Sequence, residues 1–141
     1  MKRERRRARS LALQALYEID SVGHPEEEVI ARYGGDLSPE ARQFMIELVH
    51  GTLESEPEID VLIEESAPEW PISELAVIDR NILRLAIWEL LIWGETPLKV
   101  AINEAVELAK RFGSDSAPRF VNGVLGTLAG RRNSKKPSAV K

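Results

Sequence analysis

Apolar residues recur every three or four positions along most of this chain, which is the spacing of amphipathic α-helices. In the first segment one apolar stripe consists of Ala8, Leu11, Ala12, Ala15, Leu16 and Ile19. At about 100° per residue, the roughly opposite side of this helix carries Arg6, Ser10, Leu13 and Tyr17. Gly23 and Pro25 then end the helix. The pattern predicts a first helix that buries one face and exposes the other.

Six further segments show helical spacing or the residues that start and end helices. Their expected positions are Glu26–Tyr33, a third helix from Pro39, 58–66, 73–93, 98–112 and a seventh helix capped by Ser116. The segment 73–93 is apolar on nearly every side, which is typical of a helix in the middle of a bundle. No alternating run typical of a β-strand occurs. The sequence therefore predicts an all-α fold of about seven helices.

Proline residues interrupt the helical pattern once, where Pro68 and Pro71 bracket Trp70. This break either divides two small packed bundles, which we favour, or forms a tight turn. Residues 1–130 are expected to form one helical domain with an arginine-rich arm at 1–9, followed by a basic, disordered tail at 131–141. Gly123 is expected to allow a close approach of a neighbouring backbone. No apolar run is long enough to span a membrane.

Charge is strongly separated along the chain. The net charge of the 141 residues is −4, yet residues 1–9 contain six Lys or Arg, and residues 116–141 contain six more and no acid. Between these ends, seven cations stand against 22 acids. Because a polyanion attracts cations, the basic N-terminus is a candidate for binding a nucleic-acid backbone, and we favour single-stranded RNA over duplex DNA. The acidic middle is expected to face a different partner.

Residue patterns that indicate catalysis are not found. The absence of cysteine excludes disulfides and thiol nucleophiles, and no glycine-rich phosphate loop or metal-ligand spacing occurs. His24 and His50 are interpreted as turn and surface residues. The sequence therefore predicts no enzyme, no metal and no cofactor.

Three aromatic residues are candidates for contact with RNA bases. Tyr17 lies near Arg6 on the helical projection and either stacks on a base or packs against a neighbouring helix. Phe112 and Phe120 flank a polar loop, which they either anchor or extend into an RNA-binding surface.

Several blocks of sequence are recognisable. Arg6–Arg9 reads RRAR and Gln14–Tyr17 reads QALY; Ile78–Leu90 reads IDRNILRLAIWEL. Pro97–Gly113 reads PLKVAINEAVELAKRFG and is followed by FVNGVL at Phe120–Leu125. In this order the blocks resemble the NusB family of bacterial transcription antitermination factors.

The resemblance implies two packed helical bundles and a cytoplasmic RNA-binding protein. Members of the family bind boxA, a short single-stranded element of ribosomal RNA leader transcripts. They act together with NusE, which is also a small-subunit ribosomal protein, and help RNA polymerase to pass termination signals. Whether this chain is a monomer or a homodimer is left open.

Carried over by position, the resemblance assigns RNA binding to Arg6, Arg7 and Arg9, extended by Lys2, Arg3 and Arg5. A second RNA-contacting region consists of Phe112, Ser116, Arg119 and Phe120. The candidates for the face that meets NusE are Glu74, Asp79 and Glu89. Two alternatives remain: the NusB-like domain of an rRNA methyltransferase, which requires the sequence to be a fragment, or a helical protein-interaction module that does not bind RNA.

Overall fold

A computed structural model describes the backbone of residues 2–140 and the side chains of residues 2–132. Every regular element in this part of the chain is helical. The elements are α1 (Lys2–Val22), α2 (Glu26–Arg32), α3 (Pro39–Glu54), α4 (Glu56–Ser66), the short 3₁₀ helix η1 (Ile72–Glu74), α5 (Val77–Ile87), the π-helical η2 (Trp88–Trp93), α6 (Leu98–Phe112) and α7 (Ala117–Val140). The predicted all-α fold is confirmed. None of these helices is long and apolar enough to cross a membrane.

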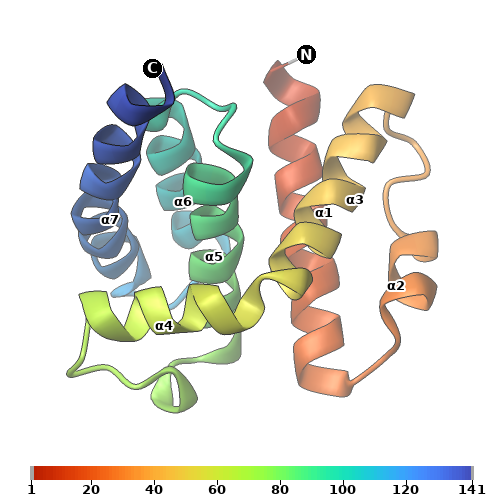
Figure 1. The fold of residues 1–141 in the computed structure, drawn as a ribbon. Coiled ribbons are helices and arrows are strands. Elements are labelled where there is room, and N and C mark those ends of the chain that lie inside the picture. Colours follow the sequence, from red (N-terminus) through yellow and green to blue (C-terminus); the bar gives the residue numbers. More distant parts are fainter. Residues whose placement is uncertain (1, 141) are drawn as a thin grey trace.

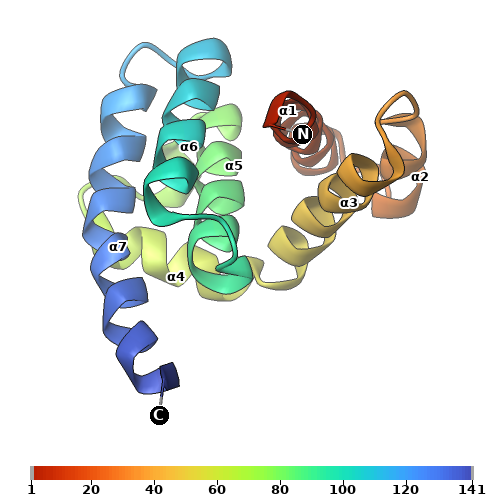
Figure 2. The same cartoon turned by 90° about the horizontal axis from the view of Figure 1, so that it is seen from above.

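The helices form two bundles that share one hydrophobic core. In Figures 1 and 2, α1, α2 and α3 lie on one side and α5, α6 and α7 on the other, with α4 crossing below the second group. The chain passes between the groups at Ser55, where α3 ends and α4 begins. The Pro68–Pro71 segment instead joins α4 to η1 within the second group. It is therefore a turn, and our preferred interpretation of it as the division between bundles was wrong.

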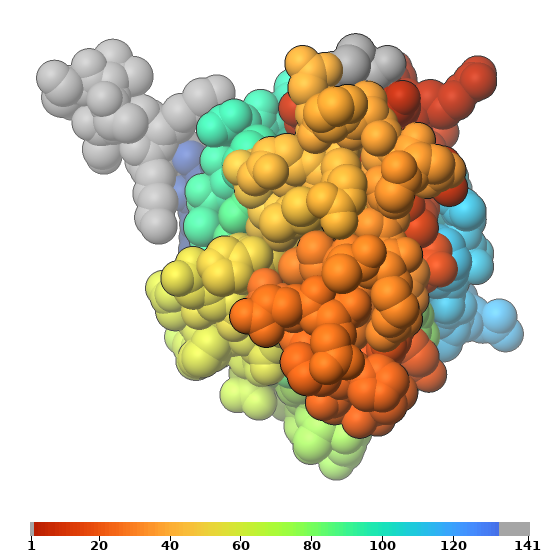
Figure 3. All heavy atoms as spheres, turned by 90° about the vertical axis from the view of Figure 1, so that its right-hand side faces the viewer, coloured from red at the N-terminus to blue at the C-terminus, as the bar shows by residue number. Residues whose placement is uncertain are grey.

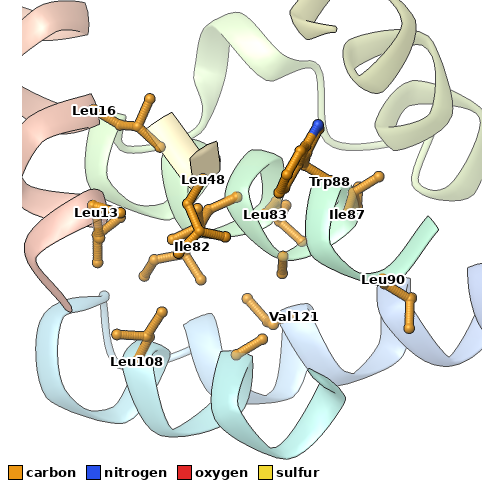
Figure 4. Packing of buried hydrophobic residues seen from close by; sticks show 14 of the residues in the cluster. Leu13, Leu16, Leu48, Ile82, Leu83, Ile87, Trp88, Leu90, Leu108 and Val121 are labelled. Carbon is orange, nitrogen blue, oxygen red and sulfur yellow. The ribbon is translucent and has the colours of Figure 1, made fainter. Parts of the chain in front are cut away.

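Helix α1 is covered on two sides, because it packs against α3 and also against α5. Leu13 and Ser10 are consequently buried, although the sequence pattern placed them on the outer face. Figure 4 shows Leu13 and Leu16 of α1 and Ile82 of α5 pointing into the same shared core. Figure 3 shows α2 and α3 (orange) covering much of α1, while the first residues of α1 (red) emerge beside α3. The N-terminal cations therefore sit on a helix that is anchored along most of its length.

The apolar segment expected at 73–93 is broken into three pieces. Leu75 and Ala76 have extended backbones, so the long helix begins only at Val77. From Trp88 the helix widens into a π-helix, and Gly94, at φ +69°, ends it when its N–H donates to the Glu89 carbonyl. Such widened turns often coincide with special side-chain positions.

A buried ion pair connects this π-helix to α1. Arg9 Nε donates to Glu89 Oε1 at 2.9 Å, and Arg9 Nη2 donates to Glu89 Oε2 at 2.6 Å. Thr96 Oγ1 also donates to Glu89 Oε2, at 2.6 Å. The two charged side chains are only 6% and 4% exposed. Arg9 is therefore not available to RNA and Glu89 is not available to a protein partner, which corrects both assignments.

A second network of charges ties α1 and α4 to α5. Asp20 of α1 accepts hydrogen bonds from Arg80, Asn81 and Arg84 of α5. Arg84 also donates to both carboxylate oxygens of Asp60 in α4, each at 2.9 Å. The hydrogen bond from Arg80 is the main cause that lowers the pKa of Asp20. This network holds both bundles to the same central helix.

Glu18 connects α1 to α2 in a similar way. Its carboxylate accepts hydrogen bonds from Arg32 and from the Tyr33 hydroxyl and contacts His24 Nδ1 at 2.7 Å. The hydrogen bond from Arg32 is the main cause that lowers the pKa of Glu18 from its ordinary value of 4.5 to about 2. The α2 layer is thus fastened to the C-terminal half of α1.

This lowered pKa predicts a pH dependence of stability. A carboxyl group whose folded-state pKa is depressed stabilises the fold above its ordinary pKa, and this contribution is lost as pH falls toward the folded value. Thermal unfolding of the wild type and of Glu18→Gln should therefore differ near neutral pH. The difference in melting temperature should shrink as pH falls from 4.5 toward about 2. A difference that is constant over this range would contradict the prediction.

Gly51 of α3 is needed for helix packing. A Cβ atom at this position would overlap the indole ring of Trp88. We expect Gly51→Ala to lower the free energy of unfolding by about 1–3 kcal/mol despite the better helix propensity of alanine. Gly126→Ala is the matched control in α7, because a Cβ there meets nothing within 4 Å. Chemical denaturation should show the control to be neutral or more stable than the wild type.

The buried ion pair generates a prediction of its own. Arg9→Met leaves the Glu89 carboxylate buried without its cation, and we expect a loss of about 3–5 kcal/mol in the free energy of unfolding. Arg9→Met combined with Glu89→Met should recover much of this loss, because no unpaired charge remains. Denaturant titration of both variants tests this, and an equal or larger loss in the double variant would count against it.

Candidate nucleic-acid interface

The exposed cations of the N-terminus lie on the first two turns of α1, and we name Lys2–Arg7 the basic segment. Lys2 and Arg3 are exposed and form no ion pair with any residue whose side chain is described. Arg5 is half-buried, with its guanidinium 4.4 Å from the centre of the Phe44 ring. The side chains of Arg6 and Arg7 are 53% and 52% exposed. Five of the six predicted N-terminal cations therefore reach the surface, and Arg9 does not.

One side of the basic segment faces α6. We call the line along which Arg6 and Ser10 of α1 contact Glu104 and Arg111 of α6 the α1–α6 seam. Arg6 Nε and Nη2 donate to the two carboxylate oxygens of Glu104, at 3.1 and 2.8 Å. These hydrogen bonds lower the pKa of Glu104 and raise the pKa of Arg6. One helical turn beyond Arg6 on α1, the hydroxyl of Ser10 accepts a hydrogen bond from Arg111 of α6, at 3.2 Å. Arg111 thus adds a cation from α6 that the sequence patterns did not single out.

The other side of the basic segment meets the loop before α3. Arg7 donates to Asp36 at 2.6 Å, and the Glu4 carboxylate accepts from the backbone N–H of Ser38 at 3.0 Å. The Arg7 hydrogen bond is the main cause that lowers the pKa of Asp36. Both ion-paired residues are more than half exposed, so this pair contributes little to stability.

Tyr17 and Phe112 are brought together by the fold. They line a surface groove of about 650 Å³. Its other lining residues are Gln14, Glu18, Ser21, Val22, Tyr33 and Ile78. Tyr17 is 43% exposed and Phe112 is half-buried. Gln14 of this first groove donates to the carbonyl of Ser10, and Phe112 directly follows Arg111, so one end of the groove lies next to the contact between Arg111 and Ser10.

Ser116, Arg119 and Phe120 line a different, second groove of about 660 Å³. The loop between α6 and α7 forms part of its wall. The ring of Phe120 stands edge-on to the ring of Trp70, with 6.2 Å between centroids. Trp70 is 54% exposed, and its sequence pattern predicted no function for it. Its position between two prolines, outside the helices, is the signal that could have indicated an exposed ring.

Asp79 is not a free surface acid. It is 7% exposed, and its two carboxylate oxygens accept from the backbone N–H and the hydroxyl of Ser114, at 3.0 and 2.6 Å. Asp79 therefore holds the α6–α7 loop in place, which corrects its assignment to an exposed partner surface. Glu74 is exposed on the rim of the second groove. Gly123 also borders this groove and faces open space, so the expected close backbone approach there is wrong.

The described C-terminal cations contact the body of the protein. Arg131 forms an ion pair with Glu65 at 3.0 Å, and Arg132 donates to the carbonyl of Gly94 at 2.9 Å. The backbone of α7 is helical to Val140. Arg131 and Arg132 are therefore held against the fold, unlike the disorder expected for them. The side chains of 133–140 and the whole of residue 141 lie outside the described residues, and the disorder expected there stays a prediction.

The two histidines are surface residues, as expected. His24 and His50 are exposed, and His50 contacts Glu26 at 3.0 Å. That contact raises the pKa of His50. Among the described residues no group of His, Asp and Glu side chains could hold a metal ion.

Known proteins are similar in sequence to this chain over most of its length. The transcription antitermination protein NusB of Roseiflexus sp. (strain RS-1) is 48% identical over 136 residues, which cover 94% of this chain and 96% of that protein. The NusB protein of Bacillus mycoides (strain KBAB4) is 39% identical, covering 89% of this chain and 96% of that protein.

Solved structures agree with these matches. NusB of T. maritima superposes with a TM-score of 0.83 at 34% identity and covers 89% of this chain and 90% of its own. The antitermination factor NusB in a crystal structure with NusE and dsRNA gives a TM-score of 0.81 at 29% identity, covering 93% of this chain and 99% of its own. Residues 6–130 match the NusB family as a whole. This chain therefore belongs to the NusB family.

Proposed function

We propose that this chain is a cytoplasmic, non-enzymatic RNA-binding factor. In this proposal it binds boxA RNA together with NusE and promotes transcription antitermination by RNA polymerase. The observation that carries the proposal is the basic segment at the start of α1. Relatives named as antitermination proteins, and a solved relative in complex with NusE and dsRNA, support the same function.

The placement of the basic segment favours an anionic ligand. The N-terminus of a helix carries partial positive charge, so acidic residues stabilise it and cations destabilise it. The first turns of α1 hold Lys2, Arg3, Arg5, Arg6 and Arg7 against the single acid Glu4. Phosphate groups bound there would compensate both the side-chain charges and the helix dipole. Packing of α1 between two layers keeps the cations together without such a ligand.

The first groove offers a continuation of the RNA-binding surface. Tyr17 lies about three helical turns beyond Arg6 on the same side of α1, and Phe112 directly follows Arg111 at the end of α6. Unpaired bases stack on aromatic rings, whereas bases in a duplex are covered by their neighbours. This arrangement favours single-stranded RNA that follows the basic segment and places a base in the first groove. Ser116, Arg119 and Phe120 border the second groove instead, so they do not extend this surface, and their contact with RNA stays a prediction.

The second groove is our candidate surface for a protein partner. It combines the apolar surface of Trp70 and Phe120 with two exposed carboxylates, Glu69 and Glu74. Exposed aromatic rings and complementary charge are common in protein interfaces. A basic partner such as a ribosomal protein fits this surface better than an RNA backbone does. Glu74 therefore remains in the proposed partner surface, whereas Asp79 and Glu89 act inside the fold.

The decisive test measures binding to three RNAs: a boxA-like single strand, a scrambled single strand and a duplex of equal length. Each is titrated with and without NusE at two salt concentrations. The proposal expects the boxA strand to bind most tightly, more tightly with NusE and more weakly at high salt. Equal weak binding to all three RNAs with no effect of NusE would overturn it. Binding of NusE without any RNA affinity would favour a protein-interaction module.

The basic segment can be tested directly with Arg6→Ala combined with Arg7→Ala. Each phosphate contact to a single strand adds about 0.7 to the slope of log affinity against log salt, so the slope should fall by up to about 1.4. RNA affinity should fall by roughly 10-fold or more, because hydrogen bonds to charged groups are lost. Fluorescence anisotropy at several salt concentrations measures both quantities.

Arg42→Ala combined with Arg131→Ala serves as the control for this pair. It removes the same charge from positions outside the basic segment and both grooves. Circular dichroism should show unchanged helicity for both pairs. If the two double variants bind RNA equally, the basic segment has no special role.

A further inference from the structure

Glu104 lies directly behind Arg6 at the α1–α6 seam. Its side chain is 10% exposed, whereas that of Arg6 is 53% exposed. Both of its carboxylate oxygens accept hydrogen bonds from Arg6, at 3.1 and 2.8 Å. An exposed arginine is normally mobile, and this one is held from the inside by two hydrogen bonds.

The contact leaves part of the arginine free for a ligand. A guanidinium group has five N–H donors in a fixed planar fork. Glu104 uses Nε and one hydrogen of Nη2, so both hydrogens of Nη1 and the second hydrogen of Nη2 have no partner among the described residues. The free edge that they form matches two oxygens of a phosphate group.

Glu104 is itself held in place. Arg9 Nη1 lies 3.8 Å from its Oε1, and Arg9 is bound to the buried Glu89. Charges therefore alternate from the core to the surface in the order Glu89, Arg9, Glu104 and Arg6. The position of the outermost guanidinium is thus set by the hydrogen bonds and ion pairs that link α1 to η2 and α6.

We propose that Glu104 is a positioning residue for RNA binding, which holds the Arg6 guanidinium so that its free edge is presented to a phosphate. This inference rests on the proposed function, because it requires Arg6 to contact RNA. Fixing the guanidinium beforehand reduces the side-chain entropy that binding would otherwise cost. The acid thus increases RNA affinity although its charge opposes that of RNA.

Replacing Glu104 has two effects on RNA binding. It releases the Arg6 guanidinium, and it removes a negative charge near the basic segment, which by itself increases the attraction for RNA. Glu107 is the matched control. It lies three residues further along α6, its side chain is 50% exposed, and it also interacts electrostatically with Arg6. Its hydrogen bond is with Lys110 rather than with the basic segment. Glu107→Gln therefore removes the same charge without releasing Arg6.

The experiment compares Glu104→Gln with Glu107→Gln by RNA anisotropy, each in the wild-type and in the Arg6→Ala background. We expect Glu107→Gln to bind as tightly as wild type or slightly more tightly. Glu104→Gln should bind about 3–10-fold more weakly than Glu107→Gln, the size of one or two net hydrogen bonds. In the Arg6→Ala background the two variants should bind within about 2-fold of each other. Melting temperatures verify that each variant is folded.

Several results would overturn the inference. Equal or tighter binding by Glu104→Gln than by Glu107→Gln would mean that Glu104 only neutralises Arg6. A difference that persists in the Arg6→Ala background would mean that Glu104 acts through the fold, by way of Arg9. If Arg6→Ala itself leaves RNA affinity unchanged, it is the proposed role of the basic segment that fails. If Arg6→Ala weakens binding and Glu104→Gln matches Glu107→Gln, only the positioning role fails.

Arg6→Lys provides a test that leaves the buried acid untouched. Lysine keeps the charge but cannot offer one edge to Glu104 and another to a phosphate. We expect RNA affinity to fall close to that of Arg6→Ala. Affinity equal to that of the wild type would show that a point charge is sufficient and would overturn the inference.

Discussion

The buried pair of Arg9 and Glu89 determines where the functional surface of this protein can lie. Two opposite charges removed from water are tolerated only when each satisfies the other, and here Thr96 adds a further hydrogen bond. The pair fixes the rotation of α1 relative to η2, since Arg9 must point inward. Arg6 and Arg7, three and two residues earlier, then lie at the surface on either side of α1.

The same arrangement explains how a helix with so many cations stays ordered. Charge repulsion at the N-terminus of α1 is opposed by carboxylates from three different elements: Glu104 of α6, Asp36 before α3 and Glu89 of η2. Further along α1, Asp20 and Glu18 reverse the pattern and accept from arginines of α5 and α2. Helix α1 therefore bears cations that pair with acids of other segments near its N-terminus, and acids that pair with arginines of other helices near its C-terminus.

Two grooves lie near the ends of α6 and α7, the first lined by Phe112 and the second by Phe120. Asp79 holds this loop through Ser114, and Gly113 allows the close packing, because a Cβ there would lie 2.7 Å from Ala117 Cβ. A rigid loop keeps Phe112 in one groove and Phe120 in the other. RNA and a protein partner can consequently be given separate surfaces on a small domain.

By itself the sequence determined the helical class, most helix positions and the existence of a basic N-terminus, because helical periodicity, the residues that start and end helices, and charge are local properties. It did not determine which side of each charged helix faces the core. Arg6 and Arg9 look equivalent in the motif, yet one is half-exposed and the other buried. Likewise Leu13 is buried because α1 is covered on two sides. These outcomes depend on which helices pack together, and only the tertiary structure brings Glu89 and Glu104 to α1 from 80 and 98 residues away.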